Sequence, residues 1–244
     1  MKTLVKLSNI NKSFFSDNGV IEVLKNISFE IKENQIIAIL GPSGCGKSTI
    51  LNILSSLEKE TSGEINSNCQ FGYMFQKDNL LEWRTILNNV LLGLEIKHQK
   101  TAENIKYVNE LLQKYQLEEF SSYHPSSLSG GMRQRVSLIR TLALKPDLLL
   151  LDEPFSALDA QTKITVQNDV FNIIKQEKKS ALIVTHDISE AIALSDKIII
   201  LSNRPATIKK VIDIEFNNLS PLNRRKNVLF SKYYNEICEQ LGIK

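Results

Sequence analysis

The chain has 244 residues, of which 42% are hydrophobic and 23% are charged, close to the averages for globular proteins. These values exclude a disordered chain or a fibrous repeat, and the length allows one large domain or a core with lobes. The net charge of +3, from 30 basic and 27 acidic residues, is too balanced to require a nucleic acid or an anionic membrane surface as partner.

Cysteine spacing and hydropathy exclude further classes. Cys45, Cys69 and Cys238 lie far apart and form no CxxC pair, so neither a zinc site nor a disulfide framework is indicated. Aliphatic runs such as Leu148–Leu151 are far shorter than the ~18 residues of a membrane span, and no signal-peptide pattern opens the chain. We expect a reducing compartment and a chain that does not itself cross a membrane.

Apolar runs and alternating segments predict two kinds of strand. Strands buried on both faces of a parallel sheet read as short apolar runs, and helical stretches separate the runs found here: Gln35–Leu40, Leu148–Leu151, Ala181–Thr185 and Lys197–Leu201. Polar and apolar residues alternate, as in half-exposed strands, around Val5–Ser8, Ile27–Lys32 and Val211–Phe216. The predicted fold is α/β, with a mainly parallel sheet and an antiparallel β subdomain.

Helical periodicity marks an insertion into this core. Ile105, Val108, Leu112 and Tyr115 recur at positions that share one face of a helix. We therefore expect a helical subdomain over about residues 78–135, inside a domain of residues 1–216.

The C-terminal residues 217–244 form a predicted helical extension. Its amphipathic stretch contains Phe230, Tyr234, Ile237 and Leu241. A basic cluster, Arg224–Lys226, precedes this stretch, and we interpret the cluster as a solvated helix end.

The segment GPSGCGKST, Gly41–Thr49, matches the phosphate-binding loop GxxxxGK[ST] between a predicted strand and a predicted helix. Glycines let successive backbone N–H groups point at one anion, the helix N-terminus adds positive potential, and Lys47 reaches the β- and γ-phosphates. Ser48 is placed to bind magnesium. An ordinary Gly- and Ser-rich turn has no need for Lys-Ser-Thr at this register, so the segment predicts a P-loop NTPase core.

Two carboxylates, Asp152 and Glu153, follow the apolar run Leu148–Leu151, and open α/β sheets bind ligands at this end of their strands. Asp152 suits a magnesium ion, and Glu153 suits a general base that activates water, the two requirements of phosphoryl transfer. The alternative is a helix-start signal, since acids and Pro154 favour a first turn. Beside a phosphate loop, the functional interpretation is favoured.

The segment Leu128–Met132 (LSGGM) precedes a helical stripe of period 3.6 that ends before Pro146. Ser129 is placed as an N-cap. Two glycine N–H groups at a helix N-terminus form a second anion site. A phosphate loop does not need a second anion site in its own chain, so this one implies a second copy of the chain. An ordinary Ser-Gly-Gly turn stays an open alternative for this segment alone.

With these motifs in this order, the chain resembles the ATP-binding cassette family over roughly residues 4–215. In that family LSGG[QM] is the signature motif, which contacts the ATP held by the opposite subunit. The resemblance implies ATP and Mg2+ as cofactors, and a homodimer, or a dimer with a sibling cassette, around two ATP molecules. It implies transmembrane permease subunits as partners, a solute-binding protein as an indirect partner, and no nucleic acid. The implied location is peripheral, at the cytoplasmic face of the cell membrane.

The resemblance also assigns roles to single residues. Phe14 falls where the family places the aromatic that stacks on adenine, with Phe15 as the alternative. Gln76, after a predicted strand, matches the glutamine that senses magnesium and contacts the permease, and His186 matches the histidine that hydrogen-bonds the γ-phosphate. Ser156–Asp159 matches the loop that packs across the dimer. The implied catalytic residues are Glu153, His186 and Gln76, the metal ligands are Ser48, Gln76 and Asp152, and the nucleotide contacts are Phe14, Gly41, Pro42, Ser43, Gly44, Cys45, Gly46, Lys47, Ser48, Thr49, Ser129, Gly130 and Gly131.

The chain departs from the family pattern at two positions. Asn34 stands where the family usually has Gly, which Asn tolerates because it enters the left-handed region readily. Glu82 stands where close relatives often have Pro. We expect neither change to touch the chemistry, and we interpret His98 and His124 as ordinary surface or hydrogen-bonded histidines.

Two segments, Leu80–Val90 and Leu201–Ala206, resemble importer ATPases of the nitrate, sulfonate and taurine type. Trp83 and Arg84 lie where such importers face the permease, although Trp83 also suits a core anchor. The resemblance implies uptake of a small anionic or zwitterionic solute. A cassette ATPase acting on DNA or the ribosome typically carries a long coiled coil or two cassettes, and a small-molecule kinase leaves Leu128–Met132 unexplained.

Overall fold

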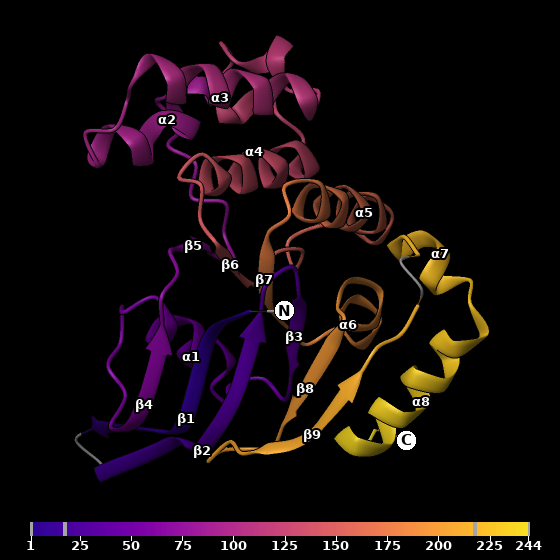
Figure 1. Cartoon of the computed structure of the whole chain (residues 1–244). Coiled ribbons are helices and arrows are strands. Elements are labelled where there is room, and N and C mark those ends of the chain that lie inside the picture. Colours follow the sequence, from indigo (N-terminus) through magenta and orange to yellow (C-terminus); the bar gives the residue numbers. More distant parts are fainter. Residues whose placement is uncertain (1, 17–18, 217–218, 244) are drawn as a thin grey trace.

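A six-stranded sheet of order β5-β6-β7-β3-β8-β9 forms the centre of the molecule (Figure 1). The computed structural model describes residues 2–16, 19–216 and 219–243. All neighbouring strands of this sheet are parallel except β8 and β9. The strands are β3 (Ile36–Leu40), β5 (Phe71–Met74), β6 (Leu148–Asp152), β7 (Ser180–Thr185), β8 (Lys197–Leu201) and β9 (Ile208–Asp213).

The apolar runs of the sequence are the inner strands β6, β7, β3 and β8, which confirms the predicted parallel core. Every residue of β3 and β7 is buried, because both faces of the sheet are covered by other elements. The turn before β3 contains Asn34 at φ 59, the left-handed conformation expected there. Parallel strands bring their carboxyl ends to one edge, and this edge carries the candidate site.

A three-stranded antiparallel sheet, of order β2-β1-β4, lies against one face of the core (Figure 1). Its strands are β1 (Thr3–Ser16), β2 (Gly19–Lys32) and β4 (Ser62–Ser67). Helix α1 (Lys47–Leu54) contributes Ile50, Leu51 and Leu54 to an apolar cluster that also contains residues of both sheets. This packing fixes α1, and the loop before it, between the two sheets.

Helices cover the opposite face of the central sheet. Helix α5 (Ala160–Gln176) packs there together with α6 (Ile188–Leu194), and a helical lobe extends beyond them (Figure 1). The lobe contains α2 (Ile86–Ile96), α3 (Ala102–Lys114), the 3-10 turns η1 (Glu118–Phe120) and η2 (Pro125–Ser127), and α4 (Gly130–Leu142). The side chains of Thr85, Thr101 and Ser129 cap α2, α3 and α4, so short polar residues mark where each helix begins.

The chain ends in α7 (Pro221–Arg225) and α8 (Val228–Leu241), which pack along α6 and β9 (Figure 1). Of the expected extension 217–244, residues 217, 218 and 244 lie outside the described residues. The expected strand around Val211–Phe216 ends earlier, at Asp213, but Phe216 remains buried against the C-terminal helices. These contacts place the last two helices on the core.

The interpretation of Arg224–Lys226 as a solvated helix end is wrong. Arg224 is 3% exposed, and its guanidinium donates to the backbone oxygen of Ser195 at 2.6 Å. Arg225 is half-buried and donates to Gln167 at 2.6 Å. Only Lys226 of this cluster is exposed, because α7 lies flat on α5 and α6 instead of projecting into solvent.

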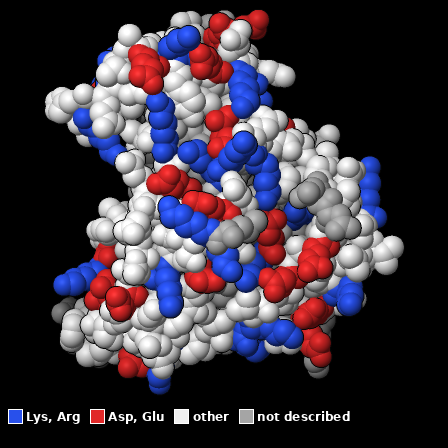
Figure 2. All heavy atoms as spheres, in the orientation of Figure 1, with Lys and Arg blue, Asp and Glu red and all other residues white. Residues whose placement is uncertain are grey.

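The surface carries both signs of charge in close mixture. On the face shown in Figure 2, Lys and Arg side chains alternate with Asp and Glu, in keeping with the near-zero balance of the sequence. Within the described ranges, no helix combines the length and apolar character needed to span a membrane.

Candidate functional site

The loop Gly41–Thr49 joins β3 to α1 and curls over the N-terminus of that helix. Gly46 has φ 117, and a Cβ there would lie 2.8 Å from side-chain atoms of Val23 and Leu24, so only glycine fits. The Lys47 side chain is buried within the loop, and Nζ donates to the backbone oxygens of Gly41 at 2.9 Å and Pro42 at 3.0 Å. The loop therefore holds an ammonium group beside a helix N-terminus, as anion binding requires.

A cavity of about 430 Å3 adjoins this loop. One wall is apolar and comes from the β1–β2 hairpin, while the other wall is the polar loop itself, a combination that suits a base at one end and phosphates at the other. Its lining residues are Phe14, Ile21, Val23, Ser43, Gly44, Gly46, Lys47, Ser48, Thr49, Glu153 and Arg204.

Phe14 forms part of the apolar wall, and Lys12 Nζ lies 4.4 Å from the centre of its ring. Phe15, its neighbour, is 85% exposed and does not line the cavity. The structure thus places the first of the two candidate aromatics beside the loop.

Ser48 and Asp152 meet at the edge of the cavity. Ser48 Oγ donates to Asp152 Oδ1 at 2.9 Å, and the Tyr73 hydroxyl donates to Asp152 Oδ2 at 3.3 Å. Burial raises the pKa of Asp152, and the two hydrogen bonds oppose that effect. A hydroxyl and a carboxylate oxygen side by side are the hard ligands that Mg2+ prefers.

Glu153, Gln76 and His186 converge at the ends of three adjacent strands. Glu153 Oε2 lies 3.2 Å from His186 Nδ1 and 3.5 Å from Gln76 Nε2. Glu153 has φ 43, a conformation unusual for a residue with a side chain and one that clusters at functional sites. It is 21% exposed and His186 is 56% exposed, so the pair is open to a ligand on one side.

The LSGGM segment does not line the cavity of its own chain. It forms the N-terminus of α4, where Ser129 Oγ accepts from the backbone N–H of Met132 at 3.4 Å, which confirms the expected N-cap. Ser129 and Gly130 are exposed, while Gly131 packs so closely on α5 that a Cβ would lie 2.7 Å from Val166. The LSGGM segment and the Gly41–Thr49 loop thus lie in different lobes of the chain.

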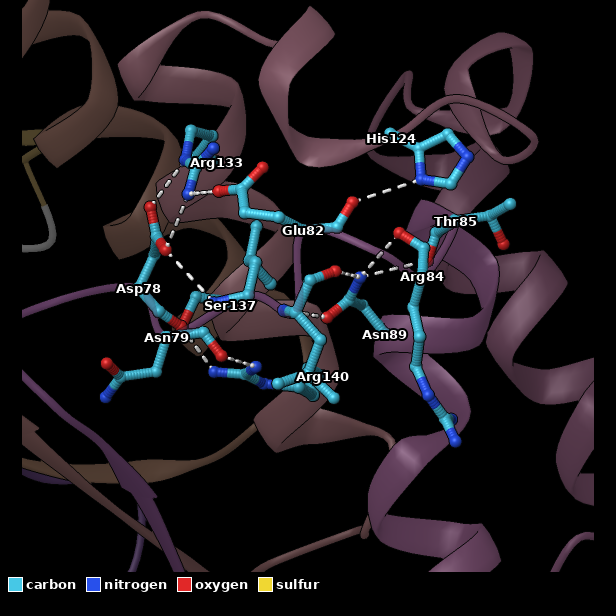
Figure 3. A network of polar contacts seen from close by, with 12 residues as sticks. Asp78, Asn79, Glu82, Arg84, Thr85, Asn89, His124, Arg133, Ser137 and Arg140 are labelled. Atoms are coloured by element: carbon cyan, nitrogen blue, oxygen red, sulfur yellow. Dashed lines mark hydrogen bonds and ion pairs between the residues drawn. The ribbon is translucent and has the colours of Figure 1, made fainter.

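A polar network connects the segment after Gln76 to α4 (Figure 3). Arg133 donates to Asp78 Oδ2 at 2.7 Å and to Glu82 Oε1 at 2.7 Å, and Arg140 donates to the backbone oxygen of Asn79 at 2.7 Å. Glu82, one of the two departures from the family pattern, therefore pairs with Arg133, the residue directly after the LSGGM segment.

Trp83 is 76% exposed, so its interpretation as a core anchor is wrong. Arg84 pairs with Glu95 at 2.6 Å on α2. This side of the lobe thus presents an indole to solvent a short distance along the chain from Gln76.

Sequence reasoning missed Arg204 and Tyr73. The Arg204 guanidinium donates from Nε to the backbone oxygen of Gly44 at 3.2 Å and lines the cavity. Its turn is held to β2 because the backbone N–H of Ala206 donates to the Val23 oxygen at 2.8 Å. Arg204 lies in the segment noted for its resemblance to importers, but no local pattern places that segment beside the phosphate loop.

Comparisons with known proteins agree with this geometry. The sequence profile of the family described as "ABC transporter" matches residues 24–156. The chain is 38% identical over 249 residues to an uncharacterized ABC transporter ATP-binding protein of Methanocaldococcus jannaschii, covering 99% of this chain and 92% of that protein. The chain belongs to the ABC transporter family.

Two further relatives of this ABC chain carry more specific descriptions. The aliphatic sulfonates import ATP-binding protein SsuB of Bacillus cereus is 38% identical over 245 residues, covering 97% of this chain and 94% of that protein. A solved dimeric ATP-binding cassette, in a post-hydrolysis state bound to ADP and Pi, is 32% identical with a TM-score of 0.74, covering 87% of this chain and 100% of that chain.

Family membership makes the chain an ATP-binding ATPase. The site fits a magnesium nucleotide, since Ser48 and Asp152 supply oxygen ligands 2.9 Å apart next to the loop lysine. Among the described residues no group of three or more His, Cys, Asp or Glu forms a metal cluster, and Mg2+ at phosphates needs only one or two carboxylates.

Proposed function

We propose that this ABC ATPase powers the uptake of a small anionic or zwitterionic solute, such as an aliphatic sulfonate or nitrate, through a separate permease at the cytoplasmic face of the cell membrane. The near full-length similarity to SsuB supports the importer type. The exposed Trp83, close in sequence to Gln76, supports a permease contact on the helical lobe, because large exposed aromatics mark binding surfaces. A solute-binding protein is the indirect partner.

The observation that carries the catalytic proposal is the contact of Glu153 with His186 at 3.2 Å beside the phosphate loop. In this proposal Lys47 and the loop N–H groups bind the phosphates, and Ser48, Asp152 and Gln76 hold Mg2+, which would neutralise charge on the phosphate oxygens. Phe14 stacks on the base.

Hydrolysis in this proposal uses Glu153 as the general base. Glu153 accepts a proton as the water oxygen bonds to the γ-phosphorus, and the bond from that phosphorus to the β–γ bridging oxygen breaks to release ADP. His186 donates a hydrogen bond to the γ-phosphate and is oriented by Glu153. The positive φ of Glu153 aims its carboxylate away from the strand direction and toward the loop.

We further propose that Ser129, Gly130 and Gly131 bind the ATP held by a second copy of the chain or a sibling cassette. The segment opens helix α4 and does not line the cavity of its own chain, and the solved dimeric cassette supports this proposal. Ser156–Asp159 would pack across the same interface. The proposed division is an ATPase domain of residues 1–216, with a helical insertion over about 78–135, and an extension of residues 217–244.

The test is uptake by a strain that lacks this chain and is complemented with wild type or Lys47→Ala. We expect growth on an aliphatic sulfonate as sole sulfur source, and uptake of the labelled sulfonate, with wild type only. Growth on sulfate provides the control, and nitrate as sole nitrogen source tests the other solute class. Unchanged uptake of every small anion without the chain would contradict the importer proposal.

A further inference from the structure

The helix α7 contacts the turn that carries His186 through a partly buried group of polar residues. This group, here called the α5–α6–α7 charge cluster, draws its members from three helices that pack together (Figure 1). Its members are Lys163, Gln167, Asp187, Glu190 and Arg225.

The cluster is continuous from α7 to the start of α6. Arg225 Nη2 donates to Gln167 Oε1 at 2.6 Å, and Gln167 Nε2 donates to Glu190 Oε2 at 3.2 Å. Lys163 Nζ lies 3.2 Å from Glu190 Oε2 and 2.7 Å from Asp187 Oδ2. A single chain of contacts therefore joins the C-terminal extension to the residue that follows His186.

The pKa of Glu190 is raised by burial to about 7, and above that pH, where Glu190 is ionised, the charges of the cluster balance only when α7 is counted. Glu190 is 2% exposed and the Asp187 side chain is 32% exposed, so one carboxylate is buried and the other is partly buried. Lys163 supplies one positive charge from α5, and Arg225 supplies the second from α7. A buried charge without a partner is strongly unfavourable, so loss of Arg225 leaves one negative charge uncompensated beneath the His186 turn.

The geometry of His186 depends on this turn. The backbone N–H of Asp187 donates to Thr185 Oγ1 at 3.0 Å, and Asp187 Oδ1 accepts from the Glu190 N–H at 3.0 Å to cap α6. His186 lies between these anchors and meets Glu153 at 3.2 Å. A shift of Asp187 therefore moves the imidazole relative to Glu153.

We infer that Arg225 is a positioning residue for ATP hydrolysis: by completing the charge balance around Asp187 and Glu190, it holds the His186 turn and couples the C-terminal helices to turnover. The inference rests on the proposed role of His186. It gives the extension a task at the active site that Lys226, the exposed residue directly after α7, does not share.

The test compares Arg225→Gln with Lys226→Gln, which removes the same charge one residue away. We expect kcat to fall by about tenfold in Arg225→Gln, within the ~10²-fold that a misplaced group costs, while KM for ATP changes less than about twofold. Lys226→Gln should match wild type. Equal kcat values for the two variants would overturn the inference.

A second variant separates charge balance from simple packing. Adding Glu190→Gln to Arg225→Gln removes one negative charge with the positive one, so kcat should recover toward that of Glu190→Gln alone. A purely structural role for Arg225 predicts a further loss instead, and that result would also overturn the inference. If Arg225→Gln is recovered unfolded, the charge-balanced double variant should still fold, and an unfolded double variant counts against the inference.

His186→Ala distinguishes this inference from the function on which it rests. Loss of turnover in His186→Ala, with Arg225→Gln equal to wild type, contradicts the role of Arg225 alone. Wild-type turnover in His186→Ala contradicts the proposed role of His186.

Discussion

Replacement of Arg224 by Met should show how much the anchoring of α7 on the core contributes to the stability of the fold. Arg224 is 3% exposed and donates to the backbone oxygens of Ser195 at 2.6 Å and Leu219 at 3.0 Å. It also lies 3.6 Å from Asp196 Oδ1. Met retains most of the stem volume but leaves the Ser195 oxygen, in a fully buried residue, without this donor.

The expected loss follows from these contacts. Leaving a buried acceptor without its donor costs about 1–3 kcal/mol, and Arg224 donates to two backbone oxygens. Asp196 is partly exposed and keeps Lys175 Nζ at 3.0 Å and the Ile36 N–H at 2.9 Å, so a loss of about 3 kcal/mol is expected for Arg224→Met. For a chain of this size, that loss lowers Tm by about 6–12 °C.

Differential scanning calorimetry of Arg224→Met beside Lys226→Met provides the measurement. The control changes an exposed residue and should stay within about 0.5 kcal/mol of wild type. Equal Tm values for the two variants would show that Arg224 does not anchor α7 on the core.

Three further predictions concern the nucleotide site and the charge cluster. Lys47→Ala should abolish ATP hydrolysis and weaken ATP binding by about 1.5–3 kcal/mol, the contribution of a charged hydrogen bond. Titration with a fluorescent nucleotide measures binding, and phosphate release measures turnover. Wild-type turnover would contradict the assignment of the Gly41–Thr49 loop. Ser129→Arg should block turnover but leave binding by the chain's own loop intact, and wild-type activity of this variant argues against the LSGGM segment. Burial raises the pKa of Glu190 from 4.5 to about 7, despite the nearby Lys163. Between these two pH values the folded state holds a proton on Glu190 that the unfolded chain has released. Stability should therefore fall as the pH rises from about 5 to 7, and Glu190→Gln should flatten this dependence in thermal unfolding. If Tm depends on pH in Glu190→Gln as it does in wild type, the raised pKa of Glu190 is wrong.

The core was predictable because its signals are local. Strands buried on both faces have nearly continuous apolar sequences, as β3, β6, β7 and β8 do. Strand β4 (SGEINS) carries no such pattern, because it lies at an exposed edge of the small sheet.

The part of the site that follows the parallel strands was predictable from the order of these strands and motifs along the chain. Residues at the carboxyl ends of parallel strands must lie at one edge, which is why the structure brings Gln76, Glu153 and His186 together. Arg204 and Arg225 were not predictable, since their partners Gly44 and Gln167 are distant in sequence. Only the folded topology specifies which surface each arginine meets.

Size-exclusion chromatography of Glu153→Gln, with and without ATP and Mg2+, tests the central claim that two chains share each ATP. Gln is nearly isosteric but cannot accept the proton of water, so hydrolysis should fall by ~10²–10⁴-fold, while binding persists because like-charge repulsion with the γ-phosphate is removed. Unhydrolysed ATP between the Gly41–Thr49 loop of one chain and Ser129–Gly131 of the other then stabilises the dimer by mass action. Only the Glu153→Gln variant with ATP and Mg2+ should elute predominantly as a dimer. A variant that binds ATP, lacks turnover and still elutes as a monomer would contradict it.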